Sequence, residues 1–116
     1  AARRELREET GFEAATVLTL LEASPNPANH SNLVFSLLAL DVAPRGPAIV
    51  DAAEVTETVL VDFPELVGEI VRGTIGMQSM HVAALMVAAS RIAAGAVRTD
   101  STLRRRLAAA LTGRHI

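Results

Sequence analysis

Hydrophobic and polar positions divide the chain into a first half with strand patterns and a second half with helix patterns. Two stretches, 15–22 and 33–42, are rich in β-branched and other apolar residues, and the second is apolar enough for a strand buried on both faces. A shorter stretch of this kind, 55–62, predicts a third strand. Because no helix pattern separates the three strands, antiparallel or mixed pairing is expected.

Beyond residue 62 the apolar positions recur at the spacing of three and four that indicates a helix. This spacing predicts helices over 64–72 and 80–95, and a last helix that begins after a capping residue within Thr99–Ser101. The arginines at 104–106 are expected to lie on the solvent-facing side of that last helix. A charged helix over 1–9 precedes the strands, so the predicted fold class is α+β.

Composition narrows the class of protein. The chain has 116 residues, half of them hydrophobic, which suits at most one domain with a real core. A net charge of −2, three phenylalanines and no tryptophan or tyrosine argue against a nucleic-acid partner. No apolar run is long enough for a membrane span, no secretory segment leads the chain, and there is no cysteine. These features predict a cytoplasmic location with no membrane partner.

The first helix carries an unusual group of carboxylates. Six of the seven residues in 3–9 are charged, and Glu5, Glu8 and Glu9 have the spacing that places them on one side of a helix. Arg4 can reach Glu8 four residues on. A solvent-exposed helix with ion pairs, each stabilising it by roughly 0.2–0.5 kcal/mol, is the ordinary interpretation. However, anions are disfavoured in the last turn of a helix, and a divalent cation would relieve their repulsion.

The segment RELREETGF, residues 4–12, resembles the second half of the Nudix box, which reads Arg-Glu-aliphatic-x-Glu-Glu-x-Gly-hydrophobic. This resemblance implies an α/β/α sandwich with a mixed β-sheet. It also implies a hydrolase that uses Mg²⁺ or Mn²⁺ to cleave the pyrophosphate of a nucleoside diphosphate linked to another group. The loop sequences that follow suggest ADP-ribose or a nucleotide sugar as the substrate.

Roles for individual residues follow from the same resemblance. Glu8 and Glu9 match the main metal ligands, and Glu5 matches a further metal-binding glutamate that in some members helps to activate water. Arg4 matches the arginine that holds the glutamates in place, and it completes the set of four catalytic candidates. Gly11 matches the glycine that lets the chain turn sharply after the helix.

Four further residues are candidates for contact with the substrate. His30 and Asn32 lie in the turn-rich segment after the first strand, and Glu54 and Glu57 are candidates for a general base outside the motif. Each has an ordinary alternative: the first two suit a solvated turn, and the two glutamates suit the solvent-facing end of a strand.

The first half of the motif, with its own glycine and glutamate, would lie upstream of Ala1. The sequence is therefore interpreted as an N-terminally truncated Nudix domain over 1–98 with a helical extension over 99–116, and weak or absent turnover is expected of these 116 residues. Family members often form homodimers, although no interface signature is evident. Two alternatives stay open, a non-catalytic nucleotide-binding regulatory domain and an inactive fragment. The complete set of three glutamates favours the hydrolase.

Overall fold

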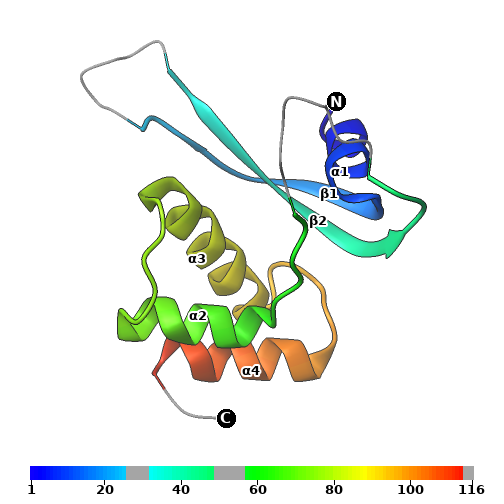
Figure 1. Ribbon diagram of the computed structural model, residues 1–116. Coiled ribbons are helices and arrows are strands. Elements are labelled where there is room, and N and C mark those ends of the chain that lie inside the picture. Colours follow the sequence, from blue (N-terminus) through cyan, green and yellow to red (C-terminus); the bar gives the residue numbers. More distant parts are fainter. Residues whose placement is uncertain (26–31, 49–56, 114–116) are drawn as a thin grey trace. The chain divides into compact units, whose positions relative to one another are not determined.

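The computed structural model of the protein describes residues 1–25, 32–48 and 57–113. These residues form four helices and one two-stranded antiparallel sheet (Figure 1). In chain order the elements are α1 (Ala2–Thr10), β1 (Phe12–Ala23), β2 (Val34–Pro44), α2 (Phe63–Arg72), α3 (Ser79–Ala93) and α4 (Ser101–Leu111). The α+β class is therefore confirmed. The α/β/α sandwich with a mixed sheet stays a prediction.

Contacts divide the chain into two compact units. The strand unit consists of Ala1–Glu22 and Phe35–Leu60, and the helical unit consists of Ala23–Val34 and Val61–Ile116. Within the helical unit, α4 packs against both α2 and α3 (Figure 1). The proposed division of the chain into 1–98 and 99–116 stays a prediction.

Two expectations about the strands are wrong. Segment 33–42 does not form a strand buried on both faces, since Phe35 is 60% exposed and Leu37 is 44% exposed. A sheet of two strands cannot cover both of its faces. The part of 55–62 that the structure describes, residues 57–62, belongs to no strand. Its apolar composition suits a strand, but it does not pair with the sheet, and Val59, Leu60 and Val61 are exposed.

Two helices of the helical unit, α2 and α4, begin directly after a residue whose side chain caps them. The carboxylate of Asp62 accepts a hydrogen bond of 3.0 Å from the backbone N–H of Glu65, and Pro64 follows in the first turn of α2. Asp100 accepts a bond of 2.8 Å from Leu103 N–H in the same way and thereby starts α4. Both caps satisfy backbone donors that have no partner inside the helix.

A small apolar core holds the three helices together. Val67 on α2, Ile92 on α3 and Leu107 on α4 are the largest fully buried side chains. Burial of each such side chain stabilises the fold by roughly 1.5–3 kcal/mol. Five smaller side chains are also buried in this unit: Pro64, Ala88, Ala89, Val97 and Ala110. The alanines leave room for the helices to approach closely.

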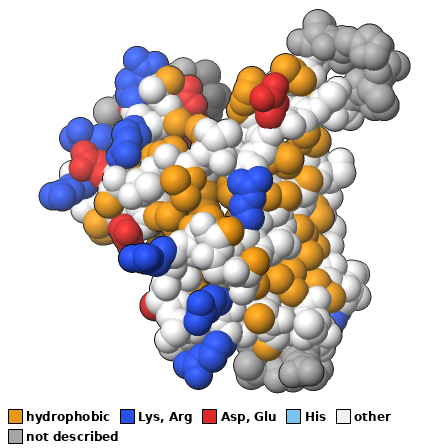
Figure 2. Space-filling view, turned by 180° about the vertical axis from the view of Figure 1, so that it is seen from behind, with side chains coloured by type: hydrophobic (Ala, Val, Ile, Leu, Met, Phe, Trp, Pro, Cys, Tyr) orange, Lys and Arg blue, Asp and Glu red, His pale blue; other side chains and the backbone are white. Residues whose placement is uncertain are grey.

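The surface has two features that the pattern of residues did not predict. Hydrophobic side chains lie open on the face shown in Figure 2 as well as on the strands. Arg106 does not simply face solvent with Arg104 and Arg105, because it pairs with Asp62. No helix in the described part of the chain is long and apolar enough to cross a membrane.

Candidate functional site

Helix α1 is short and lies on the surface, with no fully buried residue. It ends at Gly11, whose backbone adopts the left-handed conformation with φ of 79°. The N–H of Gly11 donates to the carbonyl of Arg7 at 2.8 Å, and the hydroxyl of Thr10 accepts a bond of 3.2 Å from Phe12 N–H. The expected role of Gly11 as the residue that turns the chain is therefore confirmed.

The backbone of Gly11 also contacts the segment that follows β2. Its carbonyl accepts a hydrogen bond of 2.8 Å from the N–H of Arg45, directly after β2. A Cβ atom at position 11 would lie 2.2 Å from the carbonyl oxygen of Gly46. The motif glycine is thus required twice, once for its backbone angles and once for the close approach of a second chain segment.

The three predicted metal ligands are exposed on α1. Glu8 lies near Arg4, with 3.9 Å between Oε1 and the arginine Nε, which is the expected pair four residues apart. With side chains 48% and 73% exposed, this pair adds little stability. The side chains of Glu5 and Glu9 make no ion pair or hydrogen bond with any described residue.

The donor chemistry of these glutamates suits Mg²⁺ or Mn²⁺, which prefer carboxylate oxygens. Their arrangement does not form a ready-made cage. Among the described residues, no group of three or more histidine, aspartate or glutamate side chains is placed to hold a metal ion. Mg²⁺ commonly takes only one or two carboxylates together with substrate phosphates, so the donor set fits such a shared site.

The other candidates are only partly described. His30 and Glu54 lie outside the described residues. Asn32 is exposed just before β2 and belongs to the helical unit, whereas Glu57 is exposed in the strand unit. Neither makes an ion pair or hydrogen bond with a described residue.

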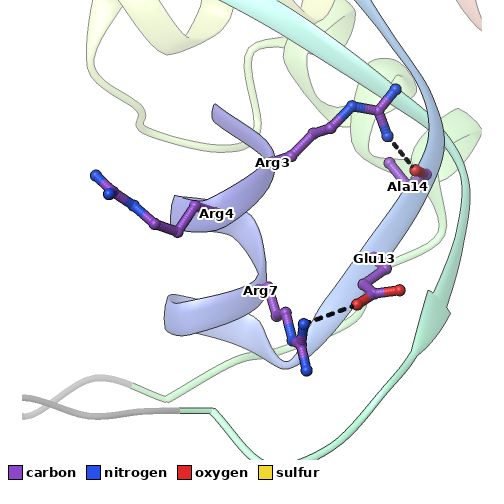
Figure 3. A pocket seen from close by; sticks show the side chains of 5 residues that line it. All are labelled: Arg3, Arg4, Arg7, Glu13 and Ala14. Atoms are coloured by element: carbon purple, nitrogen blue, oxygen red, sulfur yellow. Dashed lines mark hydrogen bonds and ion pairs between the residues drawn. The ribbon is translucent and has the colours of Figure 1, made fainter. Parts of the chain in front are cut away.

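A hollow that the sequence did not predict lies beside α1. It encloses about 360 Å³ and is lined by Arg3, Arg4, Arg7, Glu13 and Ala14. Figure 3 shows Arg3 reaching across to the carbonyl of Ala14, and Arg7 pointing toward Glu13. Arg4 extends away from these residues in the same view. The hollow therefore combines the guanidinium groups of Arg3 and Arg7 with one carboxylate, that of Glu13.

Glu13 joins two arginines that are far apart in the sequence. Its Oε1 lies 3.2 Å from Arg7 Nη1, and its Oε2 lies 3.2 Å from Arg45 Nε. A second hollow of about 240 Å³ adjoins the same arginines and is lined by Arg7, Gly11, Arg45, Gly46 and Pro47. The turn at Gly11 and the antiparallel pairing of β1 with β2 create this cluster, so no local sequence pattern indicated it.

Comparison with known proteins adds no family assignment, since neither a protein-family model nor a curated protein sequence matches the chain. Function is therefore inferred from the residues of α1 and their surroundings.

Proposed function

We propose that the chain belongs to a hydrolase that cleaves the pyrophosphate of a nucleoside diphosphate linked to another group. The observation that carries the proposal is the segment RELREETGF, which resembles the Nudix box and forms a helix followed by a left-handed glycine. An exposed helix with three glutamates, two of them without a partner among the described residues, suits a site that gains a cation. ADP-ribose or a nucleotide sugar is the proposed substrate class.

The residues of α1 have different roles in the proposed reaction. Glu8 and Glu9 would hold the cation, with Glu5 as a further ligand or as the group that takes a proton from water. A bound Mg²⁺ or Mn²⁺ supplies neutralisation of phosphate charge and lowers the pKa of a water molecule. Arg4 holds Glu8 in position from one turn away. Glu57 is an alternative proton acceptor because its carboxylate is exposed.

The competing function is a regulatory domain that binds such a nucleotide without cleaving it. A sensor needs the phosphate contacts but no activated water. The two functions therefore predict the same ligand and differ in whether a product forms.

One assay separates them. The 116-residue chain, in excess over ADP-ribose or UDP-glucose, is incubated with Mg²⁺, with Mn²⁺ or with EDTA, and nucleoside monophosphate is measured by chromatography. The hydrolase predicts this product with either metal and none with EDTA. Even a small yield of product supports the hydrolase, because weak turnover is expected of these residues. Binding of the nucleotide without product supports the regulatory domain. The absence of both binding and product contradicts both functions for these 116 residues and agrees with the inactive fragment.

A further inference from the structure

The arginine hollow beside α1 has more positive than negative charge. Its lining contributes the guanidinium groups of Arg3 and Arg7 and a single carboxylate, that of Glu13, while the Arg4 side chain extends away from them. This carboxylate is shared, because Glu13 also pairs with Arg45. Within the strand unit, Arg3, Arg7 and Arg45 thus bring three positive charges to the single carboxylate of Glu13. Such an excess attracts small anions, most strongly at low ionic strength.

The arginines have hydrogen-bond donors to spare. A guanidinium carries five N–H donors, and Arg7 and Arg45 each form one ion-pair contact, with Glu13. Their side chains are 61% and 64% exposed, so the remaining donors are accessible to a ligand. Planar donor pairs of this kind match the oxygens of phosphate, often with two parallel hydrogen bonds.

The cluster is also held in place. Arg3 donates to the carbonyl oxygens of Ala14 and Ala15 on β1, the latter at 3.4 Å, which fixes one guanidinium at the wall of the hollow. Glu13 holds two more from the same strand. Ordered side chains lose less conformational entropy when a ligand binds, and this favours affinity.

Arg7 stands between the two hollows, since it lines both of them. The second hollow adds Arg45 and the backbone of Gly46, where no atom lies within 4 Å of the position that a Cβ would take. The two hollows together could accommodate two linked phosphate groups, one on each side of Arg7.

We propose that this arginine cluster is an anion site that binds the phosphate or pyrophosphate group of a small molecule, with Arg7 as its central donor. Glu13 occupies the arginines in the absence of the ligand and competes with it. The site uses none of Glu5, Glu8 and Glu9. It therefore requires no divalent cation and is independent of the proposed hydrolase activity.

Calorimetric titration of the 116-residue chain with inorganic phosphate and with pyrophosphate, in EDTA and low salt, tests this site. We expect saturable binding, tighter for pyrophosphate, and about a tenfold loss of affinity in Arg7→Gln, because charge-assisted hydrogen bonds disappear. Arg45→Gln should weaken pyrophosphate more than phosphate. Arg98→Gln, which changes an exposed arginine of the helical unit, is the matched control and should keep full affinity.

Glu13→Gln provides the sharpest test because the expected effect has the opposite sign. Removal of the competing carboxylate frees Arg7 and Arg45, so affinity for pyrophosphate should rise several-fold. If the cluster merely stabilised the fold, Glu13→Gln would lower the midpoint of thermal unfolding and leave no gain in affinity. Absence of saturable binding, equal affinity in Arg7→Gln, or no gain in Glu13→Gln would each overturn the proposal.

Discussion

Arg106 on α4 donates two parallel hydrogen bonds to the carboxylate of Asp62, the residue that caps α2. Nη1 donates to Oδ1 at 2.9 Å and Nη2 donates to Oδ2 at 2.7 Å. Asp62 therefore acts twice, because the same carboxylate accepts the backbone N–H of Glu65. This side-chain pair joins the start of one helix to the middle of another helix, 44 residues further along the chain.

Removal of the charge at position 62 should destabilise the helical unit. Asp62→Asn keeps a side chain that caps helices well but loses the paired charge, so the midpoint of thermal unfolding should fall by a few degrees. The midpoint should fall further in Asp62→Ala, because this variant loses the cap as well. Circular dichroism at the helix signal measures both changes.

Asp100→Asn is the matched control for that experiment. Asp100 caps α4 through Leu103 N–H but has no arginine partner among the described residues, so this variant should unfold close to the unchanged chain. Equal losses in Asp62→Asn and Asp100→Asn would show that the pair with Arg106 contributes nothing. Arg106→Lys should resemble Asp62→Asn, because lysine cannot form the two-pronged bond.

Acid should remove the stabilisation that the pair of Asp62 and Arg106 contributes. The hydrogen bonds from Arg106, followed by that from Glu65 N–H, hold the pKa of Asp62 below its ordinary value of 3.8. A carboxyl with a lowered pKa in the folded state stabilises it fully above the ordinary value, and this stability is lost as the pH falls through the lowered pKa. The pKa of Arg106 is raised by the same pair, so its own contribution persists far into the alkaline range.

Thermal unfolding of the unchanged chain and of Asp62→Asn, compared from neutral pH downwards, measures this effect. The difference between their midpoints should stay constant to about pH 4 and then shrink toward zero. A difference that persisted in strong acid would mean that Asp62→Asn acts through packing and not through the charge.

Gly11 and Gly73 allow conformational strain to be separated from steric overlap. Both have left-handed backbones, with φ of 79° and 73°, but a Cβ atom meets Gly46 O at 2.2 Å only at position 11. Gly73→Ala should therefore cost roughly 1–2 kcal/mol for the left-handed conformation alone. Gly11→Ala should cost roughly 1–3 kcal/mol more, because the chain near Gly46 must shift.

Hydrogen exchange of backbone amides reports these changes unit by unit, on β1 and β2 for Gly11→Ala and on α2 for Gly73→Ala. Equal losses of protection would mean that the approach to Gly46 carries no energetic weight. Gly11→Ala should also reduce the metal-dependent activity, since it displaces the end of α1.

The proposed cation site predicts specific losses on α1. Glu8→Gln and Glu9→Gln should each weaken Mn²⁺ binding by about tenfold or more and remove most of the metal-dependent product, because each deletes a charged oxygen ligand. Electron paramagnetic resonance of free Mn²⁺ measures the binding. Glu69→Gln, on the exposed side of α2, is the control and should change neither quantity. Unchanged Mn²⁺ binding in both α1 variants would exclude these glutamates as ligands.

Local chemistry was the part of this protein that could be predicted well. A cap within Thr99–Ser101, Pro64 in the first turn of α2, and Gly11 after α1 each act within a few residues. The structure has all three, with Asp100 as the cap. Prediction from local chemistry fails for the third predicted strand. Apolar composition favours an extended chain, but a strand also needs a partner of the right register, and residues 57–62 have none among the described residues.

The sequence by itself determined approximately where the helices begin and end, where β1 and β2 lie, and which glutamates share one side of α1, because these properties depend mainly on neighbours along the chain. The tertiary structure alone decided the pairs Asp62–Arg106 and Glu13–Arg45 and the approach of Gly11 to Gly46. Such contacts close long loops, and the packing of the whole unit, not the residues themselves, selects which distant side chains meet.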